Sequence, residues 1–226
     1  MVGLAGVTGA EPGSGYRSGV SNPAQGESAG EGGQRGVSTP RWPAILTWRS
    51  HDATRMESVR VIVTGNRIRA SGRIIAGASA EHPAFSASYD LVTDESGLTR
   101  RLSLRSTLAG GERHASLSRD EENYWLVDAA GSHVRATFGG AVDADVVLSP
   151  LFNTLPIRRY GMAHATEDVT VPVVYVSLPE LQVQEAHVTY SSGPDGIHVL
   201  SPVSSATVTV DDNGFVLDYP GLAERI

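Results

Sequence analysis

The chain of 226 residues lacks several residue types, and each absence removes a class of function. It contains no cysteine, which excludes disulfides, thiolate catalysis and metal sites with cysteine ligands. It contains no lysine either, so its 18 basic residues are all arginines, against 25 acidic residues and a net charge of −7. This balance argues against a nucleic-acid partner, because such proteins gather Lys and Arg to neutralise phosphates.

Long apolar runs are missing as well. No segment offers the roughly 18 to 20 uninterrupted apolar residues that a membrane span needs, so we expect no transmembrane segment. The first 20 residues, MVGLAGVTGAEPGSGYRSGV, have neither the charged start nor the continuous apolar stretch of a signal peptide. Together with the absence of cysteine, this predicts a cytoplasmic protein.

Composition divides the chain at about residue 40. Residues 1–40 are rich in Gly, Ser, Glu and Gln and show no apolar periodicity, which is typical of a disordered tail. From residue 41 the apolar fraction rises, beginning with Trp42, Ile45, Leu46 and Trp48. We therefore expect one folded domain over residues 41–226.

Within that domain, apolar and polar residues alternate in short runs separated by turn residues. This pattern is typical of antiparallel strands with one buried face. The expected strands cover residues 58–64, 67–75, 85–92, 98–106, 113–118, 123–128, 133–140, 169–176, 181–190, 196–201, 205–210 and 215–221. Turn candidates such as Gly65-Asn66 and the Asn213-Gly214 pair lie between them. The fold class predicted is mainly β.

Residues 152–161, FNTLPIRRYG, form the one segment with a helical pattern. The helix begins at Ser149-Pro150 or, alternatively, at Asn153, since each supplies an N-cap residue. It is expected to end at Tyr160, with Gly161 in the left-handed position that follows a helix. Arg158 and Arg159 then fall in the last turn, where positive charge complements the helix dipole.

Adjacent helical residues point about 100° apart, so Arg158 and Arg159 cannot both face the same way. Just upstream, the alternation places Asp143 and Asp145 on one face of a strand. The hydrogen-bond donors of a guanidinium match the two oxygens of a carboxylate, so one interpretation is a structural Asp–Arg ion pair. The alternative is that an arginine binds an anionic head group from outside.

Two longer stretches, DADVVLSPLFNTLPIRRYG and VDDNGFVLDYPGLAER, carry a family resemblance. They resemble the bacterial glycolipid-binding family, formerly a domain of unknown function, in the run Asn153–Arg159 and in Tyr219–Leu222. The resemblance covers about residues 41–225, and Tyr160 departs from it, since an aliphatic residue is common there. It implies an antiparallel spiral β-roll wrapped around a single short helix, and a homodimer.

The leading hypothesis is a glycolipid- or lipid-binding protein without catalysis, cofactor or metal. Acyl chains would occupy the interior of the roll, and Asn153, Arg158 and Arg159 would hold the head group. Trp48 or Trp125 would stack on a sugar ring, although ordinary core packing is the alternative for both.

Two other hypotheses remain open. One is a structural homodimeric β-roll protein with no small ligand, joined through a sheet edge. The other is an unrecognised hydrolase, for which the seven scattered histidines give no known motif. Asp143 and Asp145 could serve it as an acid and base pair, although the same spacing suits two arginine partners. Ser50, His51 and Asp52 are consecutive, and consecutive strand residues point to opposite faces, so they cannot form a catalytic relay.

Overall fold

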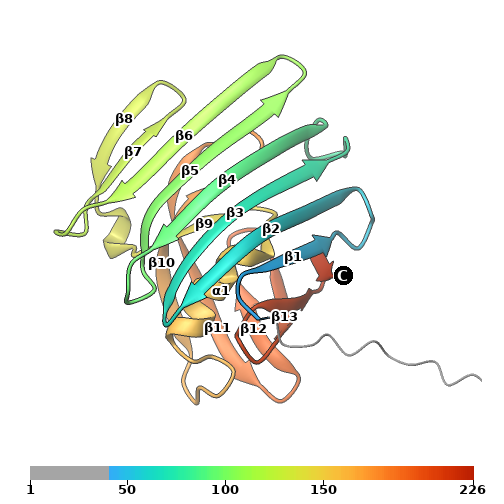
Figure 1. The fold of residues 1–226 in the computed structure, drawn as a ribbon, viewed down its shortest axis with the longest axis vertical. Coiled ribbons are helices and arrows are strands. Elements are labelled where there is room, and N and C mark those ends of the chain that lie inside the picture. The colour runs from blue at the N-terminus through green and yellow to red at the C-terminus, as the bar shows by residue number, and fades with distance from the viewer. Residues whose placement is uncertain (1–40) are drawn as a thin grey trace, which may run out of the picture. The chain divides into compact units, whose positions relative to one another are not determined.

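The computed structural model describes residues 41–226, and the tail expected over residues 1–40 lies outside the described part. The described chain forms fifteen strands in one sheet (Figure 1). The first eight are β1 Ala44–Arg49, β2 Arg55–Thr64, β3 Arg67–Ala76, β4 Phe85–Thr93, β5 Thr99–Leu108, β6 Gly111–Arg119, β7 Trp125–Ala129 and β8 Ser132–Ala136. The others are β9 Asp143–Val146, β10 Val169–Val176, β11 Val183–Gly193, β12 Gly196–Leu200, β13 Ser205–Val210, β14 Val216–Tyr219 and β15 Ala223–Arg225.

The strand order shows how the sheet winds. From β1 to β8 each strand pairs with the next one in the sequence, and β8 forms one edge of the sheet. The chain then crosses to β9 at the opposite edge. From there it returns through neighbouring strands to β15, which pairs with β1. Among the described strands only β9 and β10 are parallel, since parallel neighbours need a crossover connection and the helix supplies it here. The mainly β fold with a single short α-helix is confirmed, and the parallel pair is the exception to its antiparallel character.

Both predicted starts of the helix exist. A 3-10 turn covers Pro150–Asn153, and the α-helix α1 follows over Thr154–Arg159. Neither Ser149 nor Asn153 caps the helix with its side chain, because both side chains are engaged elsewhere. Gly161 has a φ of +59°, as expected after a helix end.

One expected strand is shorter than predicted. The run over residues 133–140 ends at Ala136, and a 3-10 turn follows over Phe138–Gly140. Phe138, Gly139 and Gly140 all have positive φ, which a strand cannot accommodate.

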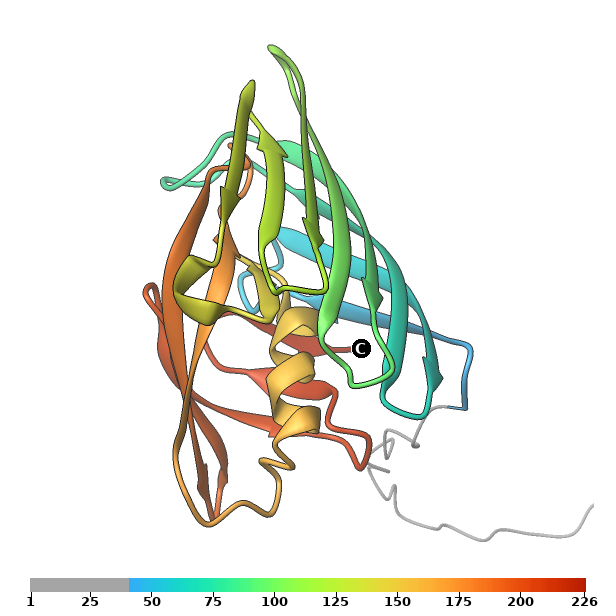
Figure 2. The same ribbon diagram turned by 90° about the vertical axis from the view of Figure 1, so that its left-hand side faces the viewer.

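The helix and the 3-10 turn before it lie inside the winding sheet, between two apolar clusters (Figure 2). Leu151, Phe152 and Leu155 pack with inward residues of β1 to β7, while Ile157 packs with inward residues of β10 to β14. Trp48 and Trp125 are fully buried in the first cluster. Side chains therefore occupy the inner face of the described sheet on both sides of α1.

Candidate functional site

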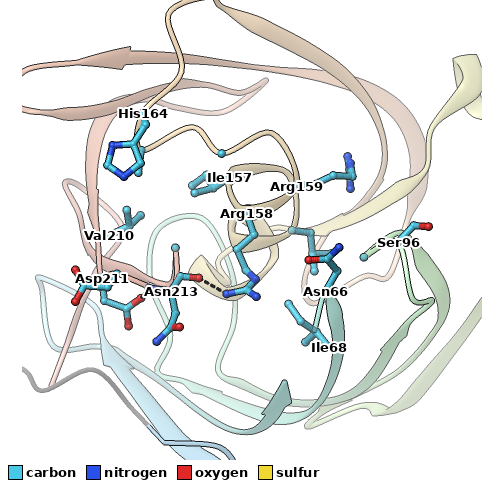
Figure 3. Close-up of a pocket in the computed structure, with 16 residues that line it drawn as sticks. Asn66, Ile68, Ser96, Ile157, Arg158, Arg159, His164, Val210, Asp211 and Asn213 are labelled. Carbon is cyan, nitrogen blue, oxygen red and sulfur yellow. Dashed lines mark hydrogen bonds between the residues drawn. The ribbon is translucent and has the colours of Figure 1, made fainter. Parts of the chain in front are cut away.

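A cavity of about 470 Å³ lies at the C-terminal end of α1 (Figure 3). The end of α1 forms one wall, and the turns after β2, β4 and β13 contribute Asn66, Ser96 and Asn213. Ile68 and Leu155 add an apolar surface. The cavity thus brings together turns that are far apart in the sequence.

Arg158 reaches across this cavity to the turn after β13. Its guanidinium donates a hydrogen bond to the backbone oxygen of Asn213 and lies 5.6 Å from the centre of the Phe215 ring. Partial burial lowers the pKa of Arg158, and the charge of Asp211 opposes that shift. Among the described residues, no carboxylate lies within ion-pair distance of Arg158. An arginine stays charged in a protein, so a cation faces the cavity.

Arg159 also borders the cavity, but its side chain turns away from Arg158 (Figure 3) and has its own counter-ion. Its guanidinium makes two hydrogen bonds to the carboxylate of Asp143, one of them 2.8 Å long. Asp143 is 1% exposed in this pair. Burial raises the pKa of Asp143, and the bonds from Arg159 oppose the rise. A bidentate bond of this kind is the strong form of an ion pair.

Asp145 has a different environment from Asp143, although all four residues of β9 are buried. No arginine lies within ion-pair distance of Asp145 in the described part of the chain. Burial and then the charge of Asp143 raise the pKa of Asp145 to about 7. Tyr175 lies directly opposite it on β10, and burial, followed by the charge of Asp145, raises the pKa of that phenol well above its ordinary value.

The three other residues predicted to contact ligand do not border the cavity at α1. Asn153 is buried and its side-chain oxygen accepts a hydrogen bond of 3.1 Å from the hydroxyl of Tyr190. Trp48 donates from its indole nitrogen to the backbone oxygen of Val216 at 2.9 Å. Trp125 donates likewise to Ala141 at 2.7 Å. The geometry of these three residues is that of satisfied core side chains.

The sequence analysis missed a third buried carboxyl group, that of Glu57. Glu57 lies inside the roll, where Oε1 accepts hydrogen bonds from the hydroxyls of Tyr89 and Ser149, the latter at 2.7 Å. Its Oε2 is buried and has no hydrogen-bond partner within the described chain. Burial raises the pKa of Glu57 to about 7. The alternation of β2 was the available signal, because Glu57 occupies an inward position between Arg55 and Val59.

Gly72 makes the contact between Tyr89 and Glu57 possible. The ring of Tyr89 lies over this glycine of β3, and a Cβ there would be 2.2 Å from the ring. Gly72 is the direct cross-strand neighbour of Tyr89, so no other residue fits beneath the ring without movement.

Ser50, His51 and Asp52 are not arranged as a catalytic triad. Ser50 donates directly to Asp52 at 2.6 Å, whereas His51 lies 3.0 Å from Asp218. No cluster of three or more His, Asp and Glu residues that could hold a metal ion occurs in residues 41–226. The helices of the same region include none long and apolar enough to cross a membrane.

Comparison with known proteins gives both a family and a fold. No curated protein matches the chain. The crystal structure of a DUF1089 family protein from Pseudomonas aeruginosa is similar, with a TM-score of 0.63 and 23% sequence identity. The match covers 84% of this chain and 100% of that one, which supports the fold. Residues 45–225 match the family described as "Putative glycolipid-binding", and the chain belongs to that family.

Proposed function

We propose that this protein binds the polar head group of a glycolipid in the cavity at the C-terminal end of α1, with Arg158 as the main contact. The observation that carries the proposal is a cation that borders a cavity and has no described counter-ion. Its neighbour Arg159 differs, because the carboxylate of Asp143 neutralises it. The family description supports a glycolipid as the ligand class.

Beside Arg158 the walls of the cavity fit the anionic group of a sugar, while Asp211 and Asp212 line another part of the cavity and Asp211 is paired with Arg225. A guanidinium presents a planar fork of donors that matches a carboxylate, sulfate or phosphate. Asn66 and Asn213 add donors and acceptors for hydroxyl groups, and Ile68 supplies an apolar surface for a ring face. Polar and apolar side chains both line the cavity, and convergent polar groups of this kind can fix the orientation of a bound sugar.

The packing around α1 bears on where the acyl chains of a glycolipid would lie. Inward side chains fill both clusters around α1, including the two tryptophans, which argues against a place for acyl chains between them. The expectation of acyl chains in the interior of the roll stays a prediction, as do the homodimer and the cytoplasmic location. We propose no catalytic step.

The proposal is tested by titration calorimetry with two soluble glycolipids below their micelle concentrations. Octyl glucuronide carries a carboxylate and octyl glucoside is its neutral counterpart. We expect Arg158→Gln to weaken glucuronide binding by about 10- to 100-fold, the range for a lost hydrogen bond to a charged group. Binding of the neutral octyl glucoside should change much less.

Arg113→Gln is the matched control, because it removes one exposed arginine from β6 and leaves the cavity intact. Circular dichroism checks that both variants fold. Equal affinity of the wild-type protein and the Arg158→Gln variant for octyl glucuronide would overturn the assignment, and so would the absence of any binding to both probes.

A further inference from the structure

The outward surface of strands β2 to β5 is rich in arginine and serine. Residues on a strand point alternately to the two faces, and the outward positions here are exposed while the inward ones pack around α1. Five exposed arginines share this surface, which we name the arginine face: Arg60, Arg69, Arg73, Arg101 and Arg105. The strands that carry them lie side by side (Figure 1).

Few carboxylates balance this charge. On β2 to β6 the outward carboxylates are Asp90 and Glu112. Asp90 accepts a hydrogen bond of 2.6 Å from the hydroxyl of Ser71. Oε2 of Glu112 lies 3.5 Å from Nη1 of Arg105 in an exposed ion pair. No described carboxylate is within ion-pair distance of the other four arginines. The surface is therefore positive in a chain whose net charge is −7.

The arginine face also contains a groove. A hollow of about 660 Å³ lies over β3 to β6, with Arg73 and Arg105 at its borders. Both arginines lie directly opposite Ser88 on β4, so their backbones are about 10 Å apart, two strand spacings. Two guanidinium groups with a hydroxyl between them form a row of donors suited to phosphate head groups.

Exposed apolar side chains lie beside this row. Met56 and Ile75 are cross-strand partners on β2 and β3, and they are 47% and 65% exposed. Ile75 is two residues from Arg73, so it projects from the same face. Arginines next to exposed apolar residues are typical of surfaces that bind the interface of a bilayer. A nucleic acid would use the arginines and leave the apolar pair in water.

We propose that the arginine face docks on the surface of an anionic phospholipid bilayer. The arginines contact lipid phosphates, and Met56 and Ile75 enter the outermost apolar layer. This surface is separate from the cavity at α1, because no residue of the arginine face lines that cavity. The two sites fit one activity, since a protein that holds a glycolipid head group meets that lipid at a membrane.

The test is co-sedimentation of the full chain with vesicles that contain no glycolipid. One set consists of phosphatidylcholine alone, and the other also contains phosphatidylglycerol. We expect binding to the anionic vesicles only, and a decrease as salt screens the charges. Each basic residue near such a surface contributes about 1 kcal/mol, so Arg73→Gln or Arg105→Gln should lower the partition coefficient about five-fold and the double variant about 25-fold.

Two further variants complete the comparison. Arg113→Gln makes the same charge change on the inward side of β6 and should bind the vesicles as the wild-type protein does. Ile75→Ser should weaken binding without altering its salt dependence. Equal binding to both vesicle types would overturn the proposal. So would arginine-dependent binding to duplex DNA or RNA without binding to vesicles. Neither result affects octyl glucuronide binding, so the two proposals fail separately.

Discussion

Arg158 and Arg159 are neighbours in the sequence with opposite environments in the fold. Arg159 turns towards β9 and shares two hydrogen bonds with a buried carboxylate. Arg158 turns towards the cavity, where a backbone oxygen is its hydrogen-bond acceptor. A buried charge needs a partner, whereas a half-buried charge at a cavity keeps its capacity for a ligand. The difference teaches that two adjacent arginines can have separate roles, one in the fold and the other, as we propose for Arg158, in binding.

The largest expected loss of stability comes from breaking the buried ion pair between Asp143 and Arg159. Asp143→Ala leaves Arg159 partly buried without its counter-ion and should lower the free energy of unfolding by about 3–5 kcal/mol. Urea unfolding measures it. The control is Glu224→Ala, which removes the exposed pair with Arg49 and should cost at most about 1 kcal/mol. If Asp143→Ala lowered the free energy of unfolding by less than the control does, the pair with Arg159 would not be important for stability.

A change of intermediate size in the free energy of unfolding is expected when Glu57, which is buried in the same roll, is replaced. Burial raises the pKa of Glu57 from 4.5 to about 7, so the folded state holds a proton that the unfolded state releases. The stability from this group is present below pH 4.5 and is lost as pH rises towards 7. Glu57→Gln mimics the protonated form and should be more stable than the wild-type protein at pH 8, by about 1–3 kcal/mol.

Urea unfolding at several pH values between 4.5 and 8 checks this expectation, and the difference between variant and wild type should grow with pH. Asp52 supplies a control of opposite sign, because hydrogen bonds from Ser50 and Thr54 lower its pKa to about 2. Both pKa values of Asp52, folded and unfolded, lie below this range, so Asp52→Asn should be less stable than the wild-type protein by an amount that does not change between pH 4.5 and 8. A pH-independent difference for Glu57→Gln would contradict the assignment.

The smallest effect on stability is expected at the cavity. Arg158→Gln removes a hydrogen bond to Asn213 and a contact with Phe215, and the shorter side chain leaves no buried charge behind. The free energy of unfolding should fall by about 1 kcal/mol or less. Thermal unfolding of this variant beside Asp143→Ala measures the contrast. A loss as large as that of Asp143→Ala would mean that Arg158 is structural and would weaken the proposed site.

Local patterns were sufficient for much of the fold. Strand alternation and turn residues such as Asn213-Gly214 predicted the hairpins, because a strand's period of two and a turn's positive φ depend only on nearby residues. The helix over 154–159 and its glycine followed from the same kind of local rule. The outward direction of Arg101 and Arg105 was also predictable from alternation.

Long-range pairing was beyond such rules. The parallel contact between β9 and β10 joins segments about 30 residues apart and depends on the helix crossing between them. The cavity needs three turns from different hairpins to meet at one helix end. Glu57 was missed because its acceptor role requires Ser149, which lies 92 residues away.

The sequence by itself determined the class of fold, the position of the helix and the residue types available for binding. Periodicity and turn chemistry are local properties, so they can be recognised in short stretches of the sequence. Only the tertiary structure decided that Arg159 is neutralised inside the roll and Arg158 faces a cavity, because burial and the distance to a counter-ion are properties of the packed chain.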